Sequence, residues 1–306
     1  MIARLAQGER LSKTRATLIG FTAVLMWSLL ALLTAASGRV PPFQLAAMSF
    51  AIAAAAGFLS RLFRSGARGR PRPPAGAWLL GVAGLFGYHF FYFTALKSAP
   101  PVEAGLINYL WPLLIVLMAA SLPGERLGWH HVAGALLGLF GTVLIVTGGE
   151  GLGIKADYAP GYAAALVAAV IWSVYSVMSR RFAGVPSDAV AGFCLLTALL
   201  SAASHLMVEE TIWPARPTEW LAVAGLGLGP VGIAFYVWDY GVKHGDIAVL
   251  GASAYMAPLL STGILILAGF GVASWTVAIA CLAITGGAAL AAKDLLAARA
   301  RSPAAD

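Results

Sequence analysis

Tyrosine and histidine side chains gather inside an apolar segment that begins near position 88. Tyr88 and Tyr92 are four residues apart, and His89 and Tyr92 are three apart, which are spacings that share one face of a helix. A polar group without a partner is costly in lipid, so this face should turn away from lipid tails. It can line a cavity and contact a bound molecule. The structural alternative is that the hydroxyls and a neutral imidazole hydrogen-bond between helices and hold them together.

A second group of such residues lies in the next apolar segment, where Asn108, Tyr109 and Trp111 come directly before Pro112. Proline has no backbone N–H, so it leaves a carbonyl of the preceding helical turn without its usual partner. Irregular backbone is tolerated in a membrane where it borders a cavity, and matching interruptions in two halves of a transporter mark binding sites. Pro258 repeats the feature near the other end of the chain. We therefore expect a binding site with hinges here, against the alternative of static kinks.

Large flat side chains lie well inside two further segments. Trp172 and Tyr175 are three residues apart, and Trp27 occupies the matching place in the first segment. Their rings offer stacking area to an aromatic ligand and a cation–π surface to an ammonium group. Packing between helices is the alternative. Trp129 and Trp275 lie at segment ends, so we assign them to the aromatic belt at the membrane surface.

A zwitterionic ligand would also need hydrogen-bonding partners within these segments. The sequence offers the Asn108 amide, the hydroxyls of Ser253 and Tyr255, and backbone groups at the proline kinks. It offers no arginine inside the apolar segments for a bidentate carboxylate contact. This set predicts modest affinity and broad selectivity.

Charged residues inside the apolar segments are few. Asp239 lies four residues before Lys243, the favourable order for a helical ion pair. Glu103 and Asp246 open two segments, where a negative charge suits a helix N-terminus. Acidic pairs deep in the membrane, which serve proton relays, are not present, so obligatory proton coupling is not supported, although His89 could titrate near physiological pH.

The motifs of several enzyme and metal-site classes are missing. The chain has no HExxH and no GxSxG sequence, and the neighbouring His130 and His131 must face different directions on a helix. Cys194 and Cys281 lie in apolar runs without metal-ligand spacing, so we expect buried, inert thiols. The sequence thus predicts no catalytic residue, no metal site and no cofactor. An intramembrane enzyme is the alternative from another functional class, and a sensor or scaffold is a third.

The elements that must position these residues are membrane helices. Of the 306 residues 60% are hydrophobic and 11% are charged, whereas soluble domains are about 25% charged. Apolar runs near the length that crosses a bilayer recur throughout, without the alternation of a β-barrel. We expect an all-α polytopic protein whose ten transmembrane helices cover approximately residues 17–37, 42–63, 75–97, 101–122, 129–149, 158–181, 187–208, 218–242, 246–270 and 274–293.

The basic residues orient these spans in the membrane. With the N-terminus inside, 16 of the 20 lysines and arginines fall in inside segments. This fits the positive-inside rule and predicts a multi-pass membrane protein with both termini cytoplasmic. The net charge of +7 therefore needs no nucleic-acid partner. The first apolar run is longer than the core of a signal peptide, so we interpret it as an uncleaved helix.

The chain carries one five-helix unit twice. At an offset of 146 positions the matching pairs are Lys97 and Lys243, Tyr109 and Tyr255, Pro112 and Pro258, and Trp129 and Trp275. Trp78 and Trp220 match at an offset of 142 positions, so the alignment of the third span with the eighth needs a gap of four residues. An odd number of spans per unit inverts the second copy, a recurring design of transporters with a substrate site near the midplane. We expect repeats at residues 1–150 and 151–306.

This pattern resembles the drug/metabolite transporter superfamily, in its ten-helix EamA-type branch, over nearly the whole chain. The residues that carry the resemblance are Trp27-Ser28 and Trp172-Ser173, Ala95-Leu96-Lys97 to Leu110-Trp111-Pro112, Pro123-Gly124-Glu125-Arg126, and Gly141 to Gly149. Members of this family export small metabolites. Tyr88-His89, Asn108 to Pro112, and Ala252 to Tyr255 are similar to a member that exports aromatic amino acids. The second half departs from the first at Ala257, which stands where Trp111 stands, so the halves need not contribute equally.

The resemblance implies an exporter of aromatic and other neutral amino acids that works by alternating access through a central aromatic cavity. Other amphipathic metabolites or drugs are the alternative substrates. The expected partners are an amino acid and the lipid bilayer. For the oligomeric state, a monomer is one option.

Overall fold

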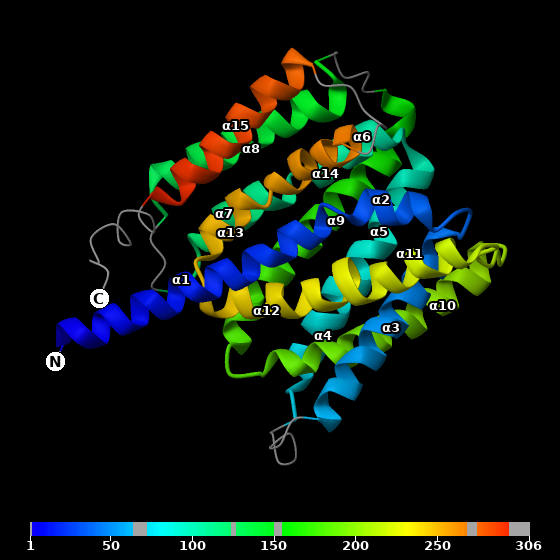
Figure 1. The fold of residues 1–306 in the computed structure, drawn as a ribbon, viewed down its shortest axis with the longest axis horizontal. Coiled ribbons are helices and arrows are strands. Elements are labelled where there is room, and N and C mark those ends of the chain that lie inside the picture. The colour runs from blue at the N-terminus through cyan, green and yellow to red at the C-terminus, as the bar shows by residue number, and fades with distance from the viewer. Residues whose placement is uncertain (1, 64–71, 124–126, 150–154, 268–273, 294–306) are drawn as a thin grey trace.

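The computed structural model describes residues 2–63, 72–123, 127–149, 155–267 and 274–293, and every regular element within these ranges is helical. Figure 1 shows the long helices running roughly side by side in stacked layers, with the N-terminus at the left. Helices suit so apolar a chain because each backbone N–H and C=O finds its partner within the segment.

The first half contains five spans, three of them interrupted. Their elements are α1 (Ile2–Trp27) with α2 (Leu30–Ala36); α3 (Pro42–Leu62); α4 (Ala75–Val82), the π-helical turn η1 (Ala83–Gly87) and α5 (Tyr88–Ser98); α6 (Pro101–Asn108) with α7 (Trp111–Ala119); and α8 (Trp129–Thr147).

The second half follows the same order. Its elements are η2 (Ala156–Tyr158), α9 (Ala159–Met178) and η3 (Ser179–Phe182); η4 (Ser187–Ala189) and α10 (Val190–Val208); α11 (Pro217–Leu228), the π-helical turn η5 (Gly229–Ile233) and α12 (Ala234–His244); α13 (Ile247–Ser253) with α14 (Met256–Leu267); and α15 (Trp275–Ala291).

Eight of these helical segments are long and apolar enough to cross a membrane, and the apolar segments Glu103–Ala119 and Trp275–Ala291 are shorter. Ten spans are consistent with this set. The first helix begins at Ile2, well before the predicted start at 17. Several sequence predictions fall outside the described residues. They concern residues 124–126 of the family motif, the boundary at 150 between the expected repeats, the last predicted residues of the ninth span, and several basic residues of the inside segments.

The two halves repeat one another most closely from the third span to the fifth, whereas the first span breaks after Trp27 and the matching helix α9 continues past Trp172. The turns η1 and η5 begin at Ala83 and Gly229, and α8 and α15 begin at Trp129 and Trp275, both at the offset of 146. α11 has 12 residues and α4 has 8, which accounts for the gap of four predicted between the third and eighth spans. The π turns were not predicted. Each one widens its helix, releases carbonyls from the regular ladder and bends the span.

The predicted interruptions at the prolines are present, but the helix breaks just before them. Tyr109 and Leu110 separate α6 from α7, and Ala254 and Tyr255 separate α13 from α14. Pro112 is the second residue of α7, in the first turn, where a missing N–H costs nothing. Their action as hinges stays a prediction.

Small residues let the last helix of each half pack closely. α8 and α15 lie side by side (Figure 1). A Cβ atom on Gly287 would lie 2.5 Å from the carbonyl oxygen of Gly134, while one on Gly141 would lie 2.6 Å from Ile284. Close approach of this kind is a main source of helix association in membranes, where hydrophobic burial offers little.

A buried carboxylate connects three helices at the end of the bundle that contains Lys97. Glu209, directly after α10, accepts hydrogen bonds from the backbone N–H groups of Phe43 (3.1 Å) and Gln44 (3.2 Å) at the start of α3, and from Lys97 Nζ (3.1 Å) and His205 Nδ1 (3.0 Å). Burial raises the pKa of the Glu209 carboxyl, but these hydrogen bonds outweigh burial and hold that pKa below its usual range. Glu209 therefore joins α3, α5 and α10.

Gly287→Leu should destabilise the protein by about 1–3 kcal/mol, because its side chain would overlap the α8 backbone. Gly286→Leu is the matched control, since a Cβ on Gly286 meets no atom within 4 Å. Thermal unfolding in detergent measures both variants. Equal losses from the two substitutions would contradict this packing.

Glu209→Gln should lower the free energy of unfolding by about 1–3 kcal/mol at neutral pH, because it removes a charged acceptor of several hydrogen bonds. A carboxyl whose pKa is depressed in the folded state contributes stability above its unfolded pKa of about 4.3, and that stability is lost as the pH falls through the folded pKa. The wild type should therefore lose its advantage over the variant on acidification below about pH 4.3. Melting temperatures as a function of pH, with the exposed Glu210→Gln as control, measure this; a pH-independent difference would contradict it.

Candidate functional site

Four tryptophans from four different helices meet at the middle of the bundle. Trp27 ends α1, Trp111 starts α7, Trp172 lies in α9 and Trp238 lies in α12. The ring centroid of Trp27 is 6.1 Å from that of Trp111, 5.7 Å from Trp172 and 5.0 Å from Trp238. Such pairs contribute about 0.5–1.5 kcal/mol each beyond their burial. The tetrad draws on both halves of the chain.

Further rings extend the tetrad on one side. Phe50 stacks on Phe235 at 5.6 Å, and His89 lies edge-on to Phe50 at 5.0 Å. Tyr88 contacts Trp172 at 5.4 Å. We call these eight residues, Trp27, Phe50, Tyr88, His89, Trp111, Trp172, Phe235 and Trp238, the central aromatic cluster.

Two polar atoms of the cluster hydrogen-bond to backbone carbonyls in the π turns. Trp27 Nε1 donates to the carbonyl of Pro230 in η5 at 3.0 Å. His89 Nδ1 lies 2.7 Å from the carbonyl of Leu85 in η1. A carbonyl only accepts, so Nδ1 of His89 carries a proton. Both N–H groups come from the first half, and they bond one carbonyl in the π turn of each half, which ties the cluster to the two turns.

The predicted face of Tyr88, His89 and Tyr92 is present on α5. Tyr88 and Tyr92 stack at 5.8 Å, and the Tyr88 hydroxyl accepts a hydrogen bond from Asn108 Nδ2 at 3.0 Å. Tyr88, Tyr92 and Tyr109 are only partly buried, whereas Trp111 is 6% exposed. The tyrosines therefore form the more open side of the cluster.

Asn108 has an unused acceptor at this place. Its side chain is 4% exposed, and its Oδ1 is buried without a hydrogen-bond partner among the described residues. An unpaired buried oxygen costs about 1–3 kcal/mol. It can accept a hydrogen bond from a ligand's N–H group.

Three predicted site residues are not members of the central aromatic cluster, although Tyr175 borders it. Tyr175 contacts Trp172 at 5.2 Å, but its ring also packs on Gly84 of η1, where an added Cβ would meet it at 2.5 Å. Tyr255 is fully buried against Gly138 of α8, away from the central cluster, and Ser253 is buried at the end of α13. The interruption of the ninth span before Pro258 turns Tyr255 toward α8 and α15.

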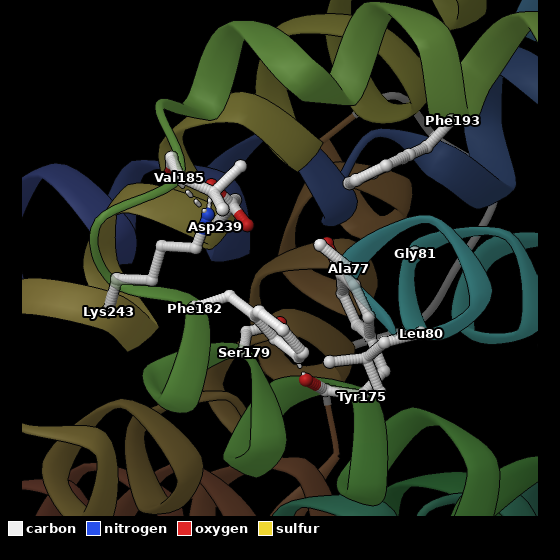
Figure 2. Close-up of a pocket in the computed structure, with 10 residues that line it drawn as sticks. All are labelled: Ala77, Leu80, Gly81, Tyr175, Ser179, Phe182, Val185, Phe193, Asp239 and Lys243. Carbon is white, nitrogen blue, oxygen red and sulfur yellow. Dashed lines mark hydrogen bonds and ion pairs between the residues drawn. The ribbon is translucent and has the colours of Figure 1, made fainter. Parts of the chain in front are cut away.

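A small pocket lies beside the cluster, between α4, α9 and α12 (Figure 2). Asp239 and Lys243 line it and form the predicted ion pair, with Oδ2 and Nζ 2.8 Å apart. Lys243 Nζ also donates to the carbonyl of Val185 at 3.0 Å, and Ser187 Oγ donates to Asp239 at 2.5 Å. The pair is therefore buried, and both partners have further hydrogen bonds.

Phe50, Phe235 and Trp238 belong to the cluster but were not predicted. The repeat contains a signal for two of them, since Phe235 stands 146 positions after His89 and Trp238 stands 146 after Tyr92. A site assigned to one half of a repeat protein should be transferred to the matching residues of the other half. Phe50 has no such signal.

The remaining predictions concern helix caps, cysteines and the tryptophans at helix ends, and the structure agrees with some of them and differs from others. Asp246 caps α13 by accepting from the N–H of Val249 at 3.1 Å, whereas Glu103 lies in the first turn of α6 without a capping bond. Cys194 is buried as expected, but Cys281 is exposed, because the outer face of α15 carries it. Trp129 and Trp275 are 68% and 86% exposed at helix starts, as belt residues should be. Within the described ranges no three His, Cys, Asp or Glu side chains gather as metal ligands.

Known proteins resemble this chain in sequence and in fold. The model of the EamA-like transporter family matches the chain twice, at residues 14–147 and 159–292. The aromatic amino acid exporter YddG of Ancylobacter novellus is 58% identical over 92% of this chain and 98% of its own length. Its namesake from Salmonella typhimurium is 28% identical over 83% of this chain and 88% of its own length.

A solved crystal structure has the same fold. The solved protein is 59% identical to this chain in sequence. The match covers 92% of this chain and 99% of the solved chain, and the TM-score is 0.87. Together with the two matches to the family model, these similarities extend over nearly all of both halves. The chain is a member of the EamA-like transporter family, within the drug/metabolite transporter superfamily.

Proposed function

We propose that this protein exports aromatic and other neutral amino acids across the inner membrane by alternating access. The observation that carries the proposal is the central aromatic cluster, drawn from both halves at the bends of the spans. The names of the similar proteins, exporters of aromatic amino acids, support the same substrate class.

The cluster suits the side chain of such a substrate. The rings of Tyr88, Trp111 and Trp172 present faces and edges at different angles, with Trp111 and Trp172 at 85° to one another. An indole or phenyl ring can stack on one of them and meet the edge of another, as aromatic pairs prefer. The amino group can lie over an indole face or donate to Asn108 Oδ1. The proposed site consists of the central aromatic cluster with Tyr92, Asn108 and Tyr109.

The charge distribution orients the protein. With both termini cytoplasmic, the end of the bundle that contains Lys97 and Glu209 faces outward, and the end that contains Asp239 and Lys243 faces the cytoplasm. The repeats at 1–150 and 151–306 are then antiparallel, and an exchange of their conformations opens the site to either side in turn. Export requires loading from the Lys243 end and release at the Lys97 end.

Other amphipathic metabolites are the second candidate substrates. The central aromatic cluster is largely apolar and contains no arginine to select a carboxylate, so a flat amphipathic cation could stack there too. Inhibition of amino acid transport by such cations would show that they bind at the same site.

Trp172→Ala should reduce counterflow of labelled L-tryptophan in proteoliposomes at least about tenfold, because it removes a central stacking surface worth about 1–3 kcal/mol. Trp275→Ala makes the same chemical change at the exposed start of α15 and should transport like the wild type. Unaffected counterflow in the Trp172 variant would remove the proposed site.

Asn108→Leu should remove the acceptor for the substrate's amino group and raise the apparent KM for L-tryptophan about tenfold, the effect of one hydrogen bond to a charged donor. Competition by indole-3-propionate provides the control, because it shares the ring and carboxylate and lacks the amino group. In the wild type tryptophan should compete far better than this analogue, and in the variant the two should become similar. An unchanged preference would exclude Asn108 as the ammonium acceptor.

A further inference from the structure

Two lysines at matching positions of the repeats lie at opposite ends of the bundle. Lys97 and Lys243 each stand in the last turn of the helix that follows a π turn, α5 and α12. Lys97 contacts the region where α3 begins. The connection that binds Lys243 lies beside the end of α3, where Arg61 donates to the carbonyl of Asp188. α3 has 21 residues, which separates the two sites by about 30 Å.

The Lys243 end is sealed. The side chains of Lys243 and Asp239 are 3% and 2% exposed. Lys243 holds the carbonyl of Val185, in the connection between η3 and η4, and Arg180 Nη1 donates to the carbonyl of Gly245 after α12 at 2.9 Å. Figure 2 shows Lys243 reaching to Val185 beside the small pocket. α12 is therefore fastened to the turn between the sixth and seventh spans.

The Lys97 end is more open. The Lys97 side chain is 46% exposed; it bonds Glu209 and lies over the ring of Phe43, 5.4 Å from the centroid. A second pair of matching positions on α5 and α12 differs in exposure in the same way. Tyr92 on α5 is partly exposed, whereas its counterpart Trp238 on α12 is 0% exposed. The asymmetry is thus present at two matched positions of α5 and α12.

The turn that Lys243 holds also has a counterpart. Val185-Pro186 matches Val40-Pro41, 145 positions earlier, in the connection before α3. In the described part of the chain Lys97 donates to Glu209 and not to the Val40 carbonyl, although Phe43, which it contacts, is only three residues further on. Lys243 therefore binds the carbonyl of its Val-Pro turn, whereas Lys97 binds Glu209 instead.

We propose that Lys97 and Lys243 are reciprocal gate residues. Each closes its own end by binding the carbonyl of the Val-Pro turn in its own half, Val40 or Val185, and the two closures alternate. The structure is then the state closed at the Lys243 end. In the opposite state Lys97 binds the Val40 carbonyl, and Lys243 and Asp239 separate from the connection before α10. This inference rests on the alternating access proposed above, and its test needs no substrate.

The test measures how accessible the sealed end is. Ala77, 4% exposed, lines the pocket beside Asp239 and Lys243, so Ala77→Cys in a Cys194→Ala, Cys281→Ala background reports opening there. The full-length protein in nanodiscs, without substrate, is labelled with a hydrophilic maleimide, and the rate is compared among variants. Lys243→Met should raise the labelling rate at least about fivefold, because it destabilises only the state closed at this end. Lys97→Met, the same change at the matching position, should leave the rate unchanged or lower it.

Two results would overturn the proposal. One is an unchanged labelling rate in Lys243→Met, and the other is an equal rise in Lys97→Met, which would indicate general loosening. Ser187→Ala, which removes one hydrogen bond from Asp239 and keeps the ion pair, should give a smaller rise and decides the matter if Lys243→Met does not fold. Because labelling is independent of transport, a failure here leaves amino acid export untouched, and a failure of amino acid transport leaves the gate result standing.

Discussion

The contact among Trp27, Trp111, Trp172 and Trp238 is the interaction on which the rest of the structure depends. Two of these rings come from each half of the chain, and each ring contacts at least one from the other half. The indole of Trp27 reaches from the first half to the carbonyl of Pro230 in the second. Helices in lipid gain little from hydrophobic burial against one another, so specific ring contacts and backbone hydrogen bonds must define how the halves meet.

The two π turns make this meeting possible. A straight helix would leave no carbonyl for Trp27 or His89, and a buried indole or imidazole N–H without a partner is costly in a membrane. Each turn frees a carbonyl, bends its span and turns the following helix face toward the centre. The helices that follow the turns, α5 and α12, carry Lys97 and Lys243 in their last turns, so the proposed gate residues lie one helix length from the π turns.

Much of this could be predicted from the sequence, and for identifiable reasons. The spans follow from apolar length, and the repeat follows from pairs such as Lys97 and Lys243 at one offset. The ion pair of Asp239 with Lys243 follows from helical spacing. The π turns could not be predicted, because their glycines are common in membrane helices and nothing local demands the wider turn. Tyr255 was placed with its counterpart Tyr109, but the repeat matches positions, and packing against Gly138 of α8 gives Tyr255 a different neighbourhood.

The central claim is that the aromatic cluster holds the substrate between the two halves. A structure of the protein with L-tryptophan bound tests it most directly. The account predicts the ligand's indole in van der Waals contact with Tyr88, Trp111 and Trp172, and its amino group at Asn108 Oδ1. A ligand bound between α8 and α15, or one that leaves the tryptophan tetrad untouched, would contradict the account.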